Sequence, residues 1–314
     1  MIRWFVPVIF FCLTPFISFS QTEDTSDVEA VRRMVSLSEV VVRSDLNVPK
    51  FLQRIKYDTT YYKAFKNLHI LGYTALNFIQ MQDKKGKVKA SLESRTRQDV
   101  DNNCREMEIL QEKTTGDFYD RNRDYNYYTA ELYASFFFPA GRVCGEGNIV
   151  KGSEHDVKRK RGLEKNKEQL KLLFFKPGQK IPGIPFMGEK LDVFDKELTQ
   201  YYNYSIDTSE LNGQPCYVFA IKRKEGLSGF EKGKVVFDNI TTWFNQKTME
   251  IVGRNYDLSF NAGVYHFDVH MQVEMTKYGE YLVPHVLRYN GDWFLFSKKR
   301  ERGIFTATLF NFNK

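Results

Sequence analysis

One segment of the sequence, residues 264–276, restricts the fold of this chain more than any other. Apolar side chains occupy every second position of it, namely Tyr265, Phe267, Val269, Met271, Val273 and Met275. Polar side chains occupy the positions between them, namely His266, Asp268, His270, Gln272, Glu274 and Thr276. Because successive side chains of a β-strand point to opposite faces, the segment predicts a long strand with one apolar and one polar face.

Further strands are predicted on both sides of an irregular middle region. Long segments joined by tight turns precede it, at 68–81, 87–97 and 104–113. After it, 201–207 and 216–223 are joined through Asn212-Gly213, a strong hairpin signal. The remaining predicted strands are 240–244, 249–260, 281–289 and 304–312. Long strands with short turns favour one large, curved antiparallel sheet.

A helix and a short strand are predicted before the first long strand. Asn47 is a suitable N-cap and Pro49 falls in the first helical turn. Helical spacing places one set of side chains on a common face, namely Phe51, Ile55, Thr59, Tyr62 and Phe65. The three valines at 40–42 predict a short edge strand. Together these patterns predict an α+β fold, in which helices pack across the concave side of one large curved antiparallel sheet.

The N-terminal residues have the composition of a targeting segment. Arg3 precedes an almost wholly apolar run, 4–19, and Ser18 and Ser20 are small residues of the kind that a signal peptidase reads. We therefore predict a signal peptide at 1–20, with a retained membrane anchor as the alternative. We predict a flexible N-terminus with the valine strand at 21–46. A single domain then spans 47–314, with an irregular insertion at about 116–195.

Charge and cysteine content narrow the classes of function. The net charge of +7 is mildly basic, and predicted export argues against a nucleic-acid partner. The cysteines outside the signal peptide are Cys104, Cys144 and Cys216, so at most one disulfide forms within the chain. No Cys-x-x-Cys pair, phosphate-binding loop, dinucleotide fingerprint or nucleophile elbow occurs. We therefore predict no catalytic residue and no cofactor.

The polar row of the opening segment is the one candidate for chemistry. His266, Asp268 and His270 follow each other at two-residue spacing, Glu274 continues the row, and His285 falls on the next strand. Such spacing could place ligands side by side for a divalent metal. A solvent-facing strand that contains two histidines explains the same pattern. We predict no metal site, and keep a metal-assisted hydrolase as a third hypothesis.

Three ordered motifs resemble those of a known superfamily. They are 214–221 (QPCYVFAI), 240–252 (ITTWFNQKTMEIV) and 281–284 (YLVP). The series is similar to that of the periplasmic lipoprotein-carrier (LolA/LolB-like) superfamily, and 38–42 (SEVVV) resembles a segment of exported Gram-negative envelope proteins of unknown function. The resemblance implies a half-barrel whose apolar cavity suits acyl chains. It also implies a location in the periplasm or on the periplasmic side of the outer membrane.

These observations lead to a first hypothesis with two alternatives. The first is a non-enzymatic envelope protein that binds an apolar or lipid-like ligand, such as an acyl chain, in the concave face of the sheet. Its predicted lining residues are Tyr265, Phe267, Val269, Met271, Val273 and Met275. The second is a structural or partner-binding subunit with a filled core, for which an outer-membrane protein is a candidate partner. The metal-assisted hydrolase is the third.

Overall fold

The structure is a computed structural model that describes residues 25–150, 162–181, 184, 187–261, 263, 265–295 and 300–314. The side chains of residues 25, 162–167, 265 and 295 are not described. The predicted signal peptide and the basic run 158–161 therefore lie outside the described residues. Among the described residues, no helix has both the length and the apolar character that a transmembrane span requires.

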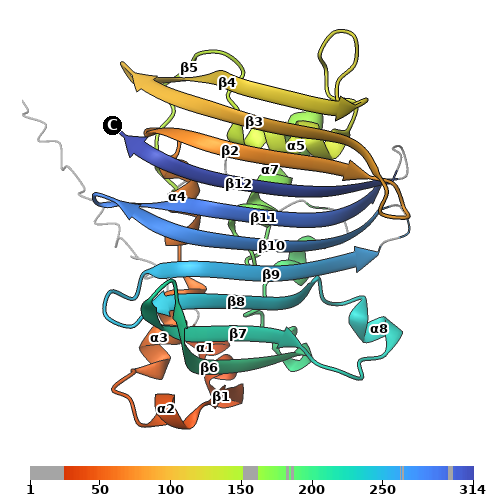
Figure 1. Cartoon of the computed structure of the whole chain (residues 1–314). Coiled ribbons are helices and arrows are strands. Elements are labelled where there is room, and N and C mark those ends of the chain that lie inside the picture. The colour runs from red at the N-terminus through yellow and green to blue at the C-terminus, as the bar shows by residue number, and fades with distance from the viewer. Residues whose placement is uncertain are drawn as a thin grey trace, which may run out of the picture.

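Twelve strands form one sheet in the described part of the chain (Figure 1). They are β1 Val35–Leu37, β2 Gly72–Gln82, β3 Val88–Asp101, β4 Cys104–Gly116, β5 Val143–Cys144, β6 Tyr202–Leu211, β7 Gln214–Arg223, β8 Phe237–Asn245, β9 Ile251–Asn261, β10 Tyr265–Tyr278, β11 Tyr281–Leu295 and β12 Glu301–Asn313. Their order is β1-β6-β7-β8-β9-β10-β11-β12-β2-β3-β4-β5, and all pairs except β1 with β6 are antiparallel. The sheet is open, because its two ends, β1 and β5, do not pair.

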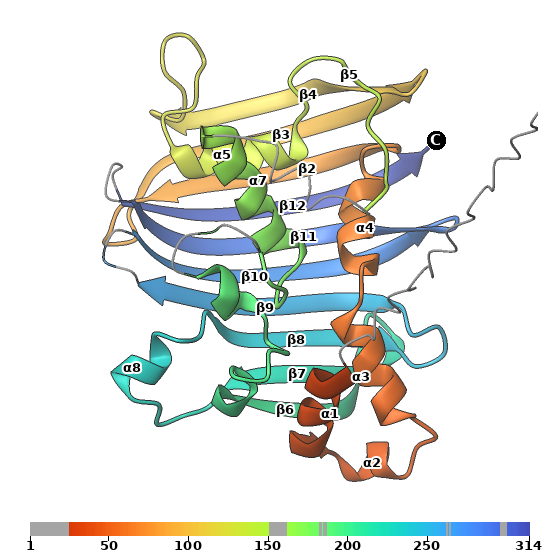
Figure 2. The same cartoon turned by 180° about the vertical axis from the view of Figure 1, so that it is seen from behind.

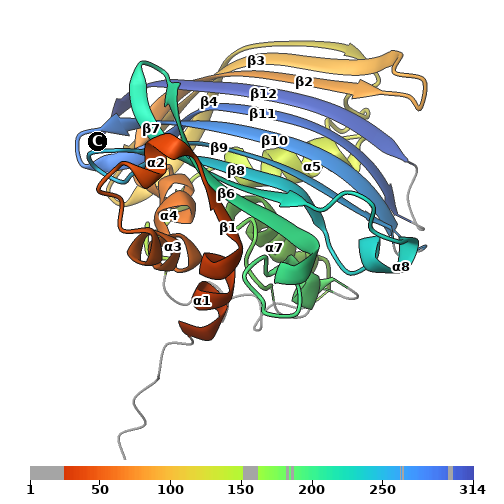
Figure 3. The ribbon, with the colours of Figure 1, turned by 90° about the horizontal axis from the view of Figure 1, so that it is seen from below.

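Most of the helices lie on one side of this sheet, whereas the short helices at 39–42 and 229–232 lie beyond its edge and its strand ends (Figure 2). The helices are α1 Thr25–Met34, α2 Glu39–Val42, α3 Val48–Lys56, α4 Thr60–Asn67, α5 Tyr128–Phe137, α7 Gly162–Phe175 and α8 Gly229–Lys232, with the short 3₁₀ helices η1 Gly188–Leu191 and η2 Thr199–Tyr201. Seen from below, the sheet curves over α4, α5 and α7, which occupy its concave side (Figure 3). The predicted α+β fold with helices across the concave face of a curved sheet is confirmed.

The strand block before the insertion and the block after it join through β12. Its residues pair with β11 on one side and with β2 on the other, for example Ala307 with Leu287 and with Asn77. The predicted Asn212-Gly213 hairpin is also present between β6 and β7. Both turn residues have positive φ, 51° and 73°, which a tight hairpin turn of this twist requires.

The N-terminal segment differs from its prediction. The three valines lie in helix α2 and not in a strand, because Val42 N–H donates to Ser38 O and Arg43 N–H donates to Glu39 O. The edge strand is β1, just before them. Residues of the predicted flexible stretch form α1, which Lys56 of α3 anchors through a 2.7 Å ion pair with Asp27.

The helix predicted from Asn47 is two helices. Asn47 Oδ1 accepts a hydrogen bond from Lys50 N at 3.1 Å and so caps α3 as predicted. Asp58 then accepts from the backbone N–H groups of Thr60 and Tyr61, which begins α4 in a new direction. The break turns the aromatic side chains of α4 toward the centre of the sheet.

Helix α5 and the last part of strand β11 were also not predicted. Helix α5 lies within the irregular insertion, and Glu301 of β12 accepts hydrogen bonds from the N–H groups of Tyr128 and Thr129 at its N-terminus. Strand β11 continues six residues beyond the predicted end at 289. Gly291 permits this continuation, because a Cβ atom there would lie 1.9 Å from Tyr289 Oη.

Candidate functional site

The apolar row of β10 lies on the concave face beneath the helices. Its described members are buried, with exposed fractions of 6% or less, namely Phe267, Val269, Met271, Val273 and Met275. The sixth predicted lining residue, Tyr265, has no described side chain. The row therefore forms part of the core under α4, α5 and α7, and the question is which members face a space that a ligand can enter.

Met271 faces a narrow space that we call the aromatic crevice. Its walls come from α5, α7 and three neighbouring strands, namely Thr129, Leu132, Tyr133, Phe136, Phe137, Phe174, Phe175, Met271, Leu287, Tyr289 and Phe305. The crevice has a volume of about 30 Å³ and its lining is almost wholly apolar. It is therefore a narrow apolar space in this conformation.

Ring contacts between α5, α7 and the sheet close the crevice. The ring centroid of Tyr133 lies 4.6 Å from that of Phe305, which in turn stacks on Tyr289 at 4.8 Å. Phe136 contacts Phe174 and Phe175 at 5.9 and 5.7 Å. Such pairs contribute about 0.5–1.5 kcal/mol each beyond the burial of their area, so ring packing helps to keep the crevice narrow.

A second and larger space, which we call the polar cavity, adjoins the crevice. It has a volume of about 370 Å³. Its lining is Tyr62, Phe65, Lys66, Leu68, His69, Tyr73, Arg105, Phe136, Phe137, Glu146, Glu168, Lys171 and Phe175. Phe136, Phe137 and Phe175 line both spaces, so an apolar crevice and a charged cavity share one aromatic wall.

A partly buried ion pair lies in the polar cavity. Arg105 Nε donates to Glu146 Oε2 at 2.5 Å, and Arg105 Nη1 donates to Gln98 Oε1 at 3.1 Å. Glu146 Oε1 lies 3.4 Å from His69 Nδ1. Although burial opposes it, the Arg105 guanidinium holds the pKa of Glu146 below its ordinary value. Burial, and then the charge of Arg105, lowers the pKa of His69 to about 4, so this imidazole is neutral at pH 7.

A disulfide holds Glu146 in this position. Cys104 of β4 and Cys144 of β5 are bonded, and Gly145 N–H donates to Asn103 O at 3.0 Å. Arg105 follows the first cysteine and Glu146 lies two residues after the second. The bond therefore brings the two partners of the ion pair to the same edge of the sheet. Cys216 is buried and free.

We expect the stability of the protein to decrease in mild acid because of His69. Its pKa of about 4 in the folded state lies below the ordinary 6.5. The unfolded chain therefore binds more protons in that window, and the free energy of unfolding falls as the pH falls from about 6.5 to about 4. The difference between the two pKa values corresponds to at most about 3 kcal/mol of unfolding free energy. Urea denaturation at several pH values should show that this free energy falls more steeply with decreasing pH in the wild type than in His69→Asn. Equal pH slopes would contradict the prediction.

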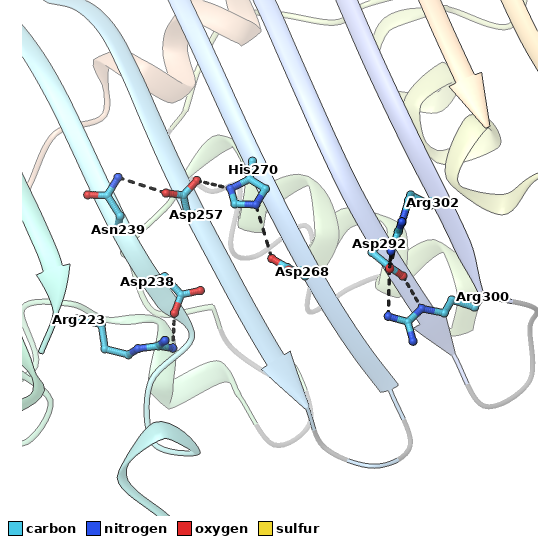
Figure 4. A network of polar contacts seen from close by, with 9 residues as sticks. All are labelled: Arg223, Asp238, Asn239, Asp257, Asp268, His270, Asp292, Arg300 and Arg302. Carbon is cyan, nitrogen blue, oxygen red and sulfur yellow. Dashed lines mark hydrogen bonds and ion pairs between the residues drawn. The ribbon is translucent and has the colours of Figure 1, made fainter. Parts of the chain in front are cut away.

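The polar row of β10 lies on the opposite, convex face. His270 Nδ1 lies 2.7 Å from Asp257 Oδ1 of β9, and His270 Nε2 lies 3.8 Å from Asp268 (Figure 4). Glu274 accepts a hydrogen bond from Arg288, and His285 Nδ1 lies 2.8 Å from a backbone carbonyl oxygen. In the part of the chain that the structure describes, no three His, Cys, Asp or Glu side chains are arranged to hold a metal ion.

Other ion pairs cross the same convex face. Asp292 of β11 accepts hydrogen bonds from Arg300 and Arg302, and Arg223 of β7 pairs with Asp238 (Figure 4). These contacts join neighbouring strands or strand ends, and the three arginines are partly exposed, whereas Asp292 is largely buried. Ion pairs with solvent-exposed partners contribute little stability each, so these contacts are not evidence of a binding site.

Comparisons with known proteins give structural neighbours only. No protein-family model matches the chain, and no curated protein matches it. The chain is similar to a domain described as an outer membrane lipoprotein-sorting protein domain, from Vibrio parahaemolyticus. The two share 9% identity and a TM-score of 0.28, over 84% of this chain and 90% of that one.

Two further solved structures are similar at the same level. One is a DUF1329 family protein from Desulfovibrio piger, with 10% identity and a TM-score of 0.24, over 81% of this chain and 93% of that one. The other is lipovitellin, with 8% identity and a TM-score of 0.23, over 77% of this chain and 25% of that one. The description of the first neighbour names lipoprotein sorting, the class that the sequence motifs resemble.

The sequence reasoning did not find the polar cavity. His69 had no recognisable partner in the sequence, whereas the structure places it beside Glu146 and Arg105. The signal that could have found it is the cysteine pair. A bond between Cys104 and Cys144 necessarily brings their charged neighbours together, but three cysteines left the pairing open. His155 lies outside the described residues.

Proposed function

We propose that this chain is a non-enzymatic, exported cell-envelope protein that binds a lipid-like ligand between its helices and the concave face of its sheet. One observation carries the proposal. The apolar aromatic crevice and the charged polar cavity adjoin each other through a shared aromatic wall. Such an arrangement suits a ligand with an apolar chain and a polar end. The signal-peptide pattern of residues 1–20 supports export to the periplasm.

Binding in this manner requires the crevice to widen. A volume of about 30 Å³ is far below the roughly 300–1,000 Å³ of small-molecule sites. Helices α5 and α7 contribute most of the walls, and α5 contacts the sheet through the ring of Tyr133 on Phe305 and through Glu301 at its N-terminus. An outward movement of α5 would expose Met271, Leu287 and Phe305, and would join the crevice to the polar cavity. In this proposal the remaining predicted lining residues of β10 form the floor.

A charge placed in the crevice should abolish the binding of acyl chains. We expect Met271→Asp to weaken binding of a fluorescent fatty-acid probe by about ten-fold or more. The reason is that the aspartate carboxylate would lose its water when the acyl chain of the probe enters the crevice. The matched control is Gln272→Asp, which adds the same charge one residue away on the exposed convex face. Fluorescence titration of the delipidated protein measures both. A wild-type protein that takes up no probe, or equal binding by the two variants, would contradict the proposal.

The second candidate is a structural or partner-binding subunit with a filled core. The small volume of the crevice favours it, since ring packing already fills the apolar part of the concave face. Native mass spectrometry of the protein isolated from the envelope separates the two functions. A bound lipid supports the carrier-like function, and a lipid-free complex with another protein supports the subunit. Of the histidines in the hydrolase hypothesis, His270 and His285 contact other groups, whereas Nδ1 of His266 is buried without a hydrogen-bond partner. No observation on the described residues favours the hydrolase over the two functions above.

A further inference from the structure

A third space lies on the concave face, at a distance along the sheet from the aromatic crevice. It has a volume of about 230 Å³, and we call it the arginine cavity. Its lining is Ile55, Lys56, Tyr57, Asp58, Pro177, Gly178, Gln179, Lys180, Asp192, Val193, Phe194, Phe219, Ile221, Ile240, Thr242 and Arg254. The walls come from α3, from the loops on either side of η1, and from strands β7 to β9. Pro177 and Gly178 follow α7, whose last residues line the aromatic crevice on the other side.

Arg254 of β9 is the unusual member of this lining. The residue is only 7% exposed, and its side chain points to the concave face. Its Nε donates to Thr242 Oγ1 at 2.9 Å, and its guanidinium carbon lies 4.4 Å from the centroid of the Tyr61 ring. Two contacts therefore fix the plane of the guanidinium. Among the described residues, no carboxylate forms an ion pair with it and its terminal N–H groups have no acceptor.

The acidic residues of the cavity are committed to other groups. Asp58 accepts hydrogen bonds from Thr60 N and Oγ1 and from Tyr61 N at the start of α4. Asp192 accepts from Phe194 N at 3.0 Å, and burial raises the pKa of Asp192. The two lysines of the lining are also paired, Lys56 with Asp27 and Lys180 with Glu189. Arg254 is therefore the cation of the lining for which no ion pair is formed among the described residues.

A buried cation without a counter-ion is costly, and a guanidinium held in one plane presents its free N–H groups as a pair of parallel donors. Carboxylates and phosphates match that geometry. A volume of about 230 Å³ admits such a group, but lies below the range of whole drug-sized ligands. We propose that the arginine cavity is an oxyanion-binding site, in which Arg254 binds the carboxylate or phosphate group of an acidic ligand. This site is separate from the lipid-binding function proposed above.

The test measures oxyanion binding by the wild-type protein first. Equilibrium titrations with inorganic phosphate and with acetate, at constant ionic strength, should show one saturable site per chain. Glycerol 3-phosphate in the same assay distinguishes the source of the anion, because it carries a lipid headgroup without an acyl chain that the aromatic crevice could bind. Tighter binding of it than of inorganic phosphate assigns a lipid headgroup, and equal binding assigns a free anion. If the wild type binds none of the three, water alone solvates Arg254 and the proposal is wrong.

Variants then locate the site. We expect Arg254→Met to weaken oxyanion binding by about ten-fold or more, because the charge and both donors are lost. Arg254→Lys should bind at an intermediate level, since it keeps the charge without the paired donors. The control is Arg95→Met on the exposed convex face of β3, which should bind as the wild type does. Unchanged binding by Arg254→Met would overturn the assignment.

The fatty-acid probe keeps the two proposals distinguishable. Arg254→Met should take up the probe as the wild type does, because none of the residues that line the crevice is altered. It should also be as stable as the wild type without an anion, since removing an unpaired buried charge offsets the loss of its packing on Tyr61. Loss of oxyanion binding with retained probe uptake supports a separate site. Loss of both together would show that the cavities form one site and would overturn their separation.

Discussion

Replacement of both Cys104 and Cys144 by serine is expected to lower the free energy of unfolding by about 4 kcal/mol, from the loop entropy of a cross-link between residues 40 positions apart. The bond joins β5 to the end of the sheet, and β5 makes only two residue pairs with β4. Without the bond, Glu146 would lose its fixed position beside Arg105. Denaturant unfolding of the oxidised protein and of the double variant measures the difference.

The thiol count provides the control for this prediction. In a chain that begins at Gln21, the unfolded oxidised protein should titrate one free thiol, that of Cys216. Reductant should destabilise the wild type and leave the double variant unchanged. Cys216→Ala, which removes a thiol outside the bond, should cost much less. A double variant within about 1 kcal/mol of the wild type would contradict the loop-entropy account.

Phe175→Ala is expected to lower the free energy of unfolding by about 3–5 kcal/mol, the range for deletion of a buried aromatic ring. Phe175 is 7% exposed and its ring stacks on Phe65 of α4 at 4.3 Å. It also forms part of the wall between the aromatic crevice and the polar cavity. The variant should therefore be less stable and should accept bulkier acyl probes than the wild type.

The matched control is Phe230→Ala in α8, where the residue is 76% exposed. This change should alter the stability by no more than about 0.5 kcal/mol. Thermal and denaturant unfolding measure both variants, and the fatty-acid titration measures probe size. If Phe175→Ala cost as little as Phe230→Ala, the packing of α7 on α4 would contribute little to the fold.

The sheet was predictable because its signals are local. Alternation along β10 and the Asn212-Gly213 turn depend on residues close together in the chain, and both are confirmed. Helix α5 was not predictable in this way. The backbone N–H groups at its N-terminus donate to Glu301, which lies more than 170 residues away. The side chain of Tyr127 at the N-cap accepts no hydrogen bond from the helix backbone. The sequence near α5 therefore contains no start signal.

The cavities were harder to predict for the same reason. Met271, one of the six residues of β10 predicted to line a ligand site, lines the crevice. The other described members of the apolar row of β10 are buried beneath helices. The positions of those helices depend on contacts between residues far apart in the sequence. Arg254 occupies a strand position where the alternation of side chains predicts burial. Its contacts with the ring of Tyr61 and the hydroxyl of Thr242 come from other elements, so the sequence near Arg254 does not indicate them.

The place of β12 between β11 and β2 has a consequence for the kinetics of folding. Residues 301–313 follow all of their sheet neighbours in the chain, yet they form the seam between the two strand blocks. Pairs such as Leu309 with Ala75 are more than 200 residues apart in the sequence. Pairing β12 with β2 therefore closes a long loop, and its entropic cost must be met late in folding. Until that step, β11 and β2 present unpaired edges, which are prone to pair with other chains. Folding should therefore be slow. The yield of native protein would depend more on protection of these two strand edges during synthesis and transport than on the stability of either strand block.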